Sequence, residues 1–296
     1  MTAAIDVREQ TAVPVPPKPR RGRQRGVAAY VVLGVLVAFT LLMVSPFVLI
    51  ILDSFKSASD YAQHGPLALP AHWTLDTITT VWRRVQFGHA LMNSLIVSFT
   101  VAVLGVALSV LNAYALGIGR VRGRVWFLVF FLVGNLLPQE GLVYPLYYLA
   151  KKAYLYDSPL SIIIIFTVIQ SAFGTYLLSS VYLEFPRELI EAAQIDGAGK
   201  LRILWQVVVP VSRPTLSVLF TFFFIWTWNE FFLPLVFLVS NSKQTVPVAL
   251  AVLQGDRLVD ATAQSASALL GIVPAIVFFL LFQRTLTRGI AAGAIK

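Results

Sequence analysis

Long uncharged stretches separated by short polar segments dominate this chain. A helix that crosses the hydrocarbon core of a bilayer needs about 20 apolar residues, at about 1.5 Å rise per residue. Four intervals without a charged residue are long enough: the stretch between Arg25 and Asp53, Val85–Gly119, Ser158–Leu183 and Ala261–Gln283. Each of them predicts one transmembrane helix.

Two further apolar intervals contain a single acidic residue. Glu140 interrupts Val125–Ala150, and Glu230 interrupts Pro214–Asn241. Both intervals are still long enough to cross a bilayer. The pattern therefore predicts an all-α integral membrane protein with six transmembrane helices.

The composition agrees with a membrane location. Hydrophobic residues make up 57% of the 296 residues and charged residues only 12%, whereas a soluble domain carries about 25% charged residues. The formal charge of +9 could indicate nucleic acid as a partner, but most of the 23 Lys and Arg residues lie on one side of the predicted helices. Positive residues concentrate in cytoplasmic loops, so we expect both termini in the cytoplasm and no nucleic acid. The groups on that side are the N-terminal arm, Arg120–Arg124, Arg187–Arg213 and Arg284–Lys296.

Three regions follow from this pattern. Residues 1–26 are basic and Pro-rich and predict a disordered cytoplasmic arm. Residues 27–289 form the six-helix transmembrane domain, and residues 290–296 a cytoplasmic tail. The first apolar run is too long for the h-region of a signal peptide, so we expect it to stay as an anchor.

The loop between the fourth and fifth predicted helices, residues 184–213, has a pattern of its own. Pro186 and the acidic Glu188 predict the start of a short helix that ends near Asp196. Leu189, Ala192 and Ala193 would share one face of it, and Gly197 suits a sharp turn at its end. A second amphipathic stretch, Lys200–Val209, would end at Pro210. From periodicity alone, an interfacial helical linker that merely connects the two spans is the favoured interpretation.

The spacing within this loop resembles a known motif. Glu191, Ala192, Ala193 and Gly197, followed by Val207–Pro210, resemble the EAA loop of binding-protein-dependent ABC importers, with Val at two positions where that family usually has Ile and Leu. The resemblance implies the type I importer permease fold. It also implies that this loop is a coupling helix docked on a dimer of nucleotide-binding ATPase subunits, with Glu191, Ala192, Ala193, Gly197 and Pro210 as the coupling residues.

The ATPase must be a separate chain. The sequence has no G-x-x-x-x-G-K-[ST] motif, because Gly199-Lys200 is followed by Leu201. We therefore expect no cofactor on this chain, with ATP and Mg on the partner ATPase.

The resemblance is to the sugar-importing, maltose-type branch of that family. The stretches LLPQEGLVYPLYYLAKKAYLYDSPLS, FIWTWNEFFLPLVFL and LTRGIAAGAIK carry it. It implies a second, unlike permease subunit, a homodimer being the alternative. It also implies an extracytoplasmic solute-binding protein, for which Asn241–Asp260 is the expected docking segment, and a sugar-like solute carried across the plasma or inner membrane.

Glu140 and Glu230 are candidates for the translocation pathway. Charges inside a bilayer are costly and usually face a water-filled cavity or a partner. Both lie near prolines that predict helix breaks, Pro138 and Pro234. The alternative is that Glu140 lies near the outer interface and Glu230 makes an intersubunit hydrogen bond. The neighbouring candidates for binding a sugar are Gln139, Tyr144, Tyr147, Trp226, Trp228 and Asn229.

Two other function classes remain as alternatives. A proton-coupled secondary transporter would use Glu140 and Glu230 as a relay, but it leaves the 184–213 motif without a role. An enzyme is less well supported, because the chain has no Cys, no H-E-x-x-H and no G-x-S-x-G.

Overall fold

The computed structural model describes residues 27–119, 121–255 and 261–294. All regular elements in these ranges are helical. The predicted arm, residues 1–26, and the end of the predicted tail lie outside the described residues. So do residues 256–260 of the expected docking segment.

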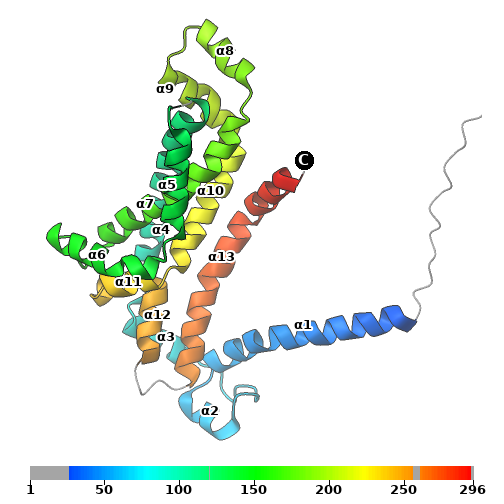
Figure 1. Cartoon of the computed structure of the whole chain (residues 1–296). Helices are drawn as coiled ribbons and strands as arrows, with labels where there is room; N and C mark the ends of the chain where they lie inside the picture. Colours follow the sequence, from blue (N-terminus) through cyan, green and yellow to red (C-terminus); the bar gives the residue numbers. More distant parts are fainter. Residues whose placement is uncertain (1–26, 120, 256–260, 295–296) are drawn as a thin grey trace, which may run out of the picture. The chain divides into compact units, whose positions relative to one another are not determined.

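The helices follow one another from α1 to α13 (Figure 1). Their bounds are α1 Val27–Ser54, α2 Ala58–His64, α3 Asp76–Arg84, α4 Phe87–Ala113, α5 Arg124–Leu136, α6 Gln139–Lys152, α7 Pro159–Leu183, α8 Arg187–Ile195, α9 Lys200–Ile203, α10 Val209–Asn229, α11 Phe232–Phe237, α12 Val246–Gly255 and α13 Ala261–Ala294. π-helical turns extend α4 over Tyr114–Ile118 and join α9 to α10 over Leu204–Val208, and a 3₁₀ turn covers Asn241–Lys243.

Among the described residues, five helices are long and apolar enough to cross a membrane. A sixth crossing is possible if α5 and α6 together form one bent span. The helical, multi-pass architecture predicted from the uncharged intervals is confirmed. In residues 27–48, a unit by itself, the helix exposes apolar side chains such as Leu33, Leu36 and Phe39, as expected for a surface that meets lipid.

The core of residues 49–294 is the packing of α4 against α7 and α10. Gly174 of α7 lies so close to α4 that a Cβ there would collide with Ser109 and with the ring of Phe223. Small residues allow this close approach of transmembrane helices. A second cluster, which includes Phe166, Leu233 and Phe237, packs α7 with α11 and α6.

The third predicted span is sharply bent. α5 and α6 meet at an angle of 97° across Leu137 and Pro138, both of which have extended backbone. Proline lacks the N–H that a helix interior needs, and it disfavours helical geometry at the residue before it. The break predicted at Pro138 is confirmed, whereas Pro145 lies inside α6 without ending it.

The fifth predicted span begins earlier than expected. The helix is continuous from Lys200 to Asn229. The predicted amphipathic stretch therefore leads into the span as expected, but the end at Pro210 and the start of the span at Pro214 were wrong. Pro210 lies in the first turn of α10, directly after the π-helical turn. The wider turn shifts the hydrogen-bonding pattern where the proline ring would otherwise clash with the carbonyl four residues before it.

The two ends of the α4–α7–α10 bundle carry different elements. Figure 1 shows α8 and α9 at one end and α11, α12 and α3 at the other. α13 runs from the end near α12 toward the end that carries α8. The loop with the EAA-like spacing is therefore separated from the expected docking segment by the length of the bundle.

Candidate functional site: the α8 segment

α8 presents two different faces. Ile190 and Ala193 are half-buried and pack against the main core. Leu189, Ala192 and Ile195 are exposed, and Ile195 is among the most exposed apolar side chains. The expectation that Leu189, Ala192 and Ala193 share one face was therefore wrong for Ala193, which turns toward the bundle. The exposed side of α8 combines Ala192 with the carboxylate of Glu191.

Gly197 ends α8 in a Schellman motif. The amide of Ala198 donates to the carbonyl of Ala193 at 2.9 Å, and the amide of Gly197 donates to Gln194 at 3.0 Å. Gly197 has φ +76°, in the left-handed region that glycine adopts without strain. The residue type at 197 therefore fixes the direction in which the chain leaves α8.

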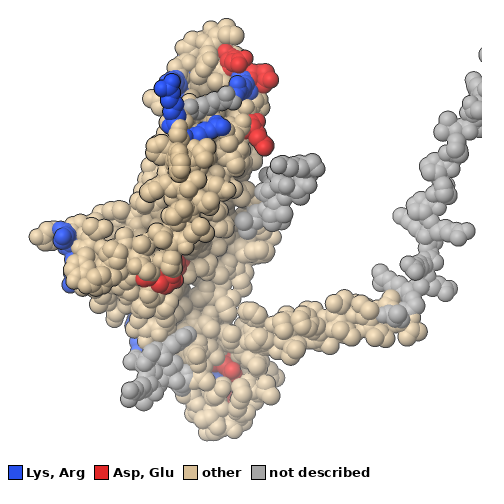
Figure 2. Space-filling view, in the orientation of Figure 1, with Lys and Arg blue, Asp and Glu red and all other residues tan. Residues whose placement is uncertain are grey.

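A cavity of about 190 Å³ lies between α8 and the ends of α4 and α7. Acidic and basic side chains gather over this end of the molecule (Figure 2). α8 thus contacts the bundle through Ile190 and Ala193, and a polar hollow separates the rest of its inner side from the bundle. The lining residues are Gly117, Ile118, Tyr182, Leu183, Phe185, Arg187, Ile190, Glu191 and Gln194.

A single helix connects the α8 end of the bundle to the break at Glu230. Lys200 follows α8 closely, and its carbonyl accepts a hydrogen bond from the hydroxyl of Tyr114 at 3.1 Å. The helix passes through the half-buried Pro210 and ends at Asn229. The α8 end of the bundle and the break at Glu230 thus lie at the two ends of one helix.

The candidate pathway residues lie on α6, at the end of α10 and in the break before α11, and α6 and α11 pack together. Glu140 is exposed in the first turn of α6, beside the half-buried Gln139. The hydroxyl of Tyr144 donates to that of Tyr148 at 3.1 Å. Glu230 lies in the break between α10 and α11, where its Oε1 accepts from the amide of Phe232 at 3.2 Å.

These residues are not joined into one site. Among the described residues, Glu140 and Glu230 make no hydrogen bond or ion pair with each other. Asn229 bonds only within its own helix, to the carbonyl of Ile225 at 2.8 Å. Trp228, a candidate sugar contact, is buried against Phe224 and Phe278 and is a core residue.

Asp157 is a structural residue that the sequence did not single out. Its Oδ1 accepts from the amides of Val239 and Ser240, both at 3.0 Å, and its Oδ2 accepts from Lys243 Nζ at 3.0 Å. It thereby ties the α6–α7 loop to the start of the expected docking segment. Burial raises the pKa of this carboxyl, but the hydrogen bonds from Ser240 and Lys243 outweigh it and lower the pKa to about 2.

The contribution of Asp157 to folding stability should change with pH only at acidic pH. An unfolded Asp titrates near pH 3.9, so a carboxyl with a folded pKa of about 2 stabilises the fold fully above pH 4 and loses this effect as the pH falls toward 2. We expect Asp157→Asn to lower the thermal midpoint by the same amount at pH 5 and at pH 8, and by less at pH 3. Glu184→Gln serves as the control. If the thermal midpoint difference between Asp157→Asn and the unmodified protein changed between pH 5 and pH 8, the low pKa of Asp157 would be contradicted.

Comparison with known proteins identifies the class of protein. Residues 105–291 match the family described as binding-protein-dependent transport system inner membrane component. The chain belongs to this family. The match contains α8, Glu191, Gly197 and Pro210, so the segment described above lies within the family's defining region.

Relatives of this permease match it over most of its length. It is 33% identical over 228 residues to a putative ABC transporter permease protein, ORF1, of Streptomyces antibioticus, which covers 77% of this chain and 100% of the relative. It is 26% identical over 263 residues to the diacetylchitobiose uptake system permease protein NgcG of Streptomyces coelicolor, covering 88% and 87%.

A solved structure shares the fold of the permease. It is of a bacterial ABC transporter involved in the import of the acidic polysaccharide alginate, with a TM-score of 0.75, 24% identity and coverage of 90% of this chain and 99% of the other. The permease is therefore a multi-pass membrane subunit and not an enzyme, and ATP hydrolysis belongs to a separate subunit. No group of His, Asp and Glu side chains that could hold a metal ion occurs in the part of the chain that the structure describes.

Proposed function

We propose that the permease forms half of the translocation pathway of an ATP-driven importer for a sugar or sugar-like solute. The proposed solute class is supported by relatives named for diacetylchitobiose uptake and alginate import. Gln139, Glu140, Tyr144, Asn229 and Glu230 are the proposed pathway residues. What supports them is their position at the two breaks, in α5–α6 and α10–α11, where backbone polar groups can line a cavity.

The coupling to ATP hydrolysis is proposed to run through Glu191–Pro210. The observation that carries this proposal is the exposed side of α8, a short helix at one end of the bundle (Figure 1) that ends in the turn at Gly197. Ala192 offers little side-chain bulk, which permits close approach of a partner. Glu191 offers a carboxylate for a charge-assisted hydrogen bond. This face would dock into a groove on a nucleotide-binding subunit, and that subunit would bind ATP and Mg at its own site.

We propose the other partners from the resemblance to importer permeases and from the separation of the two ends of the bundle (Figure 1). The end that carries α8 is proposed to be cytoplasmic, together with both termini, and the segment 241–260, whose described part begins at the other end, is proposed to meet the extracytoplasmic binding protein. The second half of the pathway would come from an unlike permease subunit. The family assignment gives no support to a proton-coupled transporter, in which the α8 segment has no role.

Replacement of Glu191 by lysine tests the coupling proposal. We expect Glu191→Lys to lower solute-stimulated ATP hydrolysis by the complete complex in proteoliposomes by roughly tenfold or more, because a charge-assisted hydrogen bond contributes about 1.5–3 kcal/mol. Membrane insertion should be normal. Glu184→Lys, a charge reversal just outside α8, is the matched control and should retain coupling. Equal activity of the two variants would contradict the role of Glu191.

A further inference from the structure

The segment between α2 and α3 exposes an unusual amount of apolar surface. We refer to residues 65–75 as the apolar loop. Leu67 is 78% exposed, Leu69 is 70% exposed and Trp73 is 62% exposed, and Leu75 is exposed as well. The loop contains no Asp, Glu, Lys or Arg. Loops that face water are normally polar, so these side chains need another environment.

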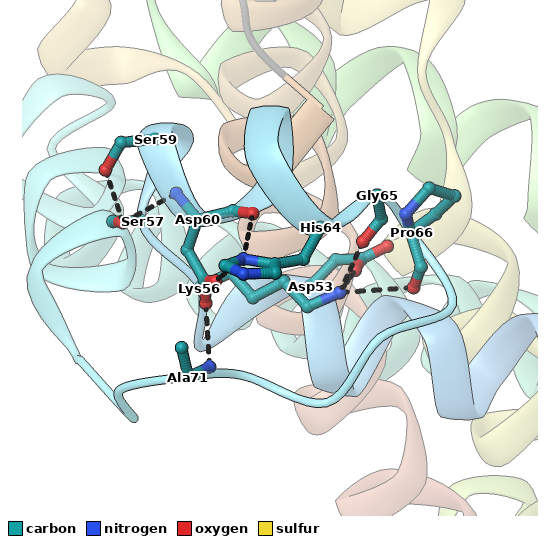
Figure 3. A network of polar contacts seen from close by, with 9 residues as sticks. All are labelled: Asp53, Lys56, Ser57, Ser59, Asp60, His64, Gly65, Pro66 and Ala71. Atoms are coloured by element: carbon teal, nitrogen blue, oxygen red, sulfur yellow. Dashed lines mark hydrogen bonds and ion pairs between the residues drawn. The ribbon is translucent and has the colours of Figure 1, made fainter.

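The start of the apolar loop is fixed by a buried lysine (Figure 3). Lys56 has a relative exposure of 0%. Its Nζ donates to the carbonyls of Gly65 at 3.0 Å and Pro66 at 3.2 Å, and it pairs with Asp53 Oδ1 at 2.8 Å. A buried ammonium needs such partners for its three protons.

The far side of the apolar loop is fixed as well. Asp60 Oδ2 accepts from the amide of Ala71 at 3.0 Å (Figure 3), and the amide of Thr74 donates to the carbonyl of Phe55 at 3.0 Å. The ring of Trp73 lies 5.7 Å from that of Phe55, measured between centroids. The backbone is therefore held in place while the leucine side chains point outward.

These contacts also set the depth of the apolar loop. α1 ends at Ser54, and both ends of the loop are bonded to Phe55 and Lys56, directly after that end. The loop therefore lies level with the end of a helix that is long and apolar enough to cross a membrane. At this level the membrane–water interface favours tryptophan, whose ring is apolar and whose N–H is polar.

We propose that the apolar loop lies in the bilayer interface and inserts Leu67, Leu69 and Trp73 into the lipid beside the end of α1. The attachment of the loop to Phe55 and Lys56, directly after the end of α1, favours lipid as the occupant. A docking surface for a protein would carry a polar rim with charged residues, and the loop has no charged residue. Trp82 of α3, 43% exposed, is a second tryptophan in the connection between α1 and α4. The proposal holds whichever side of the membrane this end faces.

The absence of cysteine from the sequence makes a direct test simple. Single variants Leu67→Cys, Leu69→Cys and Gln63→Cys of the full chain would carry a nitroxide spin label in vesicles of phosphatidylethanolamine and phosphatidylglycerol. Gln63 is exposed on the polar helix α2 and is the matched control. Oxygen, which concentrates in lipid, and a water-soluble nickel chelate then compete in relaxing each label.

We expect labels at 67 and 69 to collide with oxygen several-fold more often, relative to the nickel chelate, than the label at 63. Ratios equal to that at 63 would overturn the proposal, because the loop would then lie in water. Protection of the labels from both reagents would overturn it too, because a second permease subunit or a binding protein would then cover the loop.

Discussion

Replacement of Gly197 by proline should abolish coupled transport while leaving the transmembrane domain inserted. Proline fixes φ near −65°, whereas residue 197 has φ +76° and donates its amide hydrogen to Gln194. The substitution removes both the left-handed turn and this hydrogen bond, at a cost of about 3 kcal/mol or more, which corresponds to roughly a 100-fold loss of the docking-competent conformation. Solute-stimulated ATP hydrolysis by the reconstituted complex measures the loss.

A neighbouring glycine provides the control for this experiment. Gly199 has φ −72°, and an added Cβ would meet no atom within 4 Å. We expect the complex with Gly199→Ala to show normal solute-stimulated ATP hydrolysis. This result would show that the loss in Gly197→Pro comes from the turn at residue 197 and not from replacing a glycine in this loop. If Gly197→Pro transported as well as Gly199→Ala, the coupling role of the α8 segment would have to be abandoned.

Among the variants described here, replacement of Lys56 by methionine should produce the largest loss of folding stability. Removing one partner of a buried ion pair leaves an uncompensated charge and costs about 3–5 kcal/mol, and here the charge is on Asp53. The carbonyls of Gly65 and Pro66 would lose their donor in the same step. We expect Lys56→Met to lower the temperature at which the detergent-solubilised protein loses its monodisperse gel-filtration peak.

Two further variants separate the buried pair from a general effect of charge. The Lys243 side chain is 43% exposed in its pair with Asp157, so Lys243→Met should cost no more than about 1 kcal/mol. In Asp53→Leu/Lys56→Met the stranded carboxylate is gone, and part of the stability should return. Equal losses for Lys56→Met and Lys243→Met would show that the Lys56 network does not stabilise the fold.

The sequence predicted the fold where the relevant pattern is local. Uncharged intervals located α1, α4, α7 and α13 because a transmembrane helix is defined by its own length and apolarity. The predicted start of the helix that contains α10 was wrong because proline usually ends a helix. Here the π-helical turn over Leu204–Val208 accommodates Pro210 within the helix. The 97° bend at Pro138 shows the opposite outcome for the same residue type.

In the candidate site, too, the features set by neighbouring residues could be predicted and those set by distant contacts could not. The short helix α8 and the turn at Gly197 could be predicted, since both depend on neighbouring residues. The inward position of Ala193 could not, because it depends on contact with the distant core. Asp157 and its partner Ser240 are 83 residues apart, and no local pattern links them. The roles of the coupling and pathway residues stay predictions.

The unbroken helix from Lys200 to Asn229 has a mechanical consequence. Thirty residues of helix are about 45 Å long, so a tilt of about 5° at the α8 end would move the other end by about 4 Å, more than the width of a water molecule. The part of this helix beyond Pro214 contains no further proline or π-helical turn, so this part would move as one rod. Opening and closing near Glu230 would then require only a small rotation at the proposed ATPase contact, and any bending would be expected at the π-helical turn and the two prolines near the α8 end.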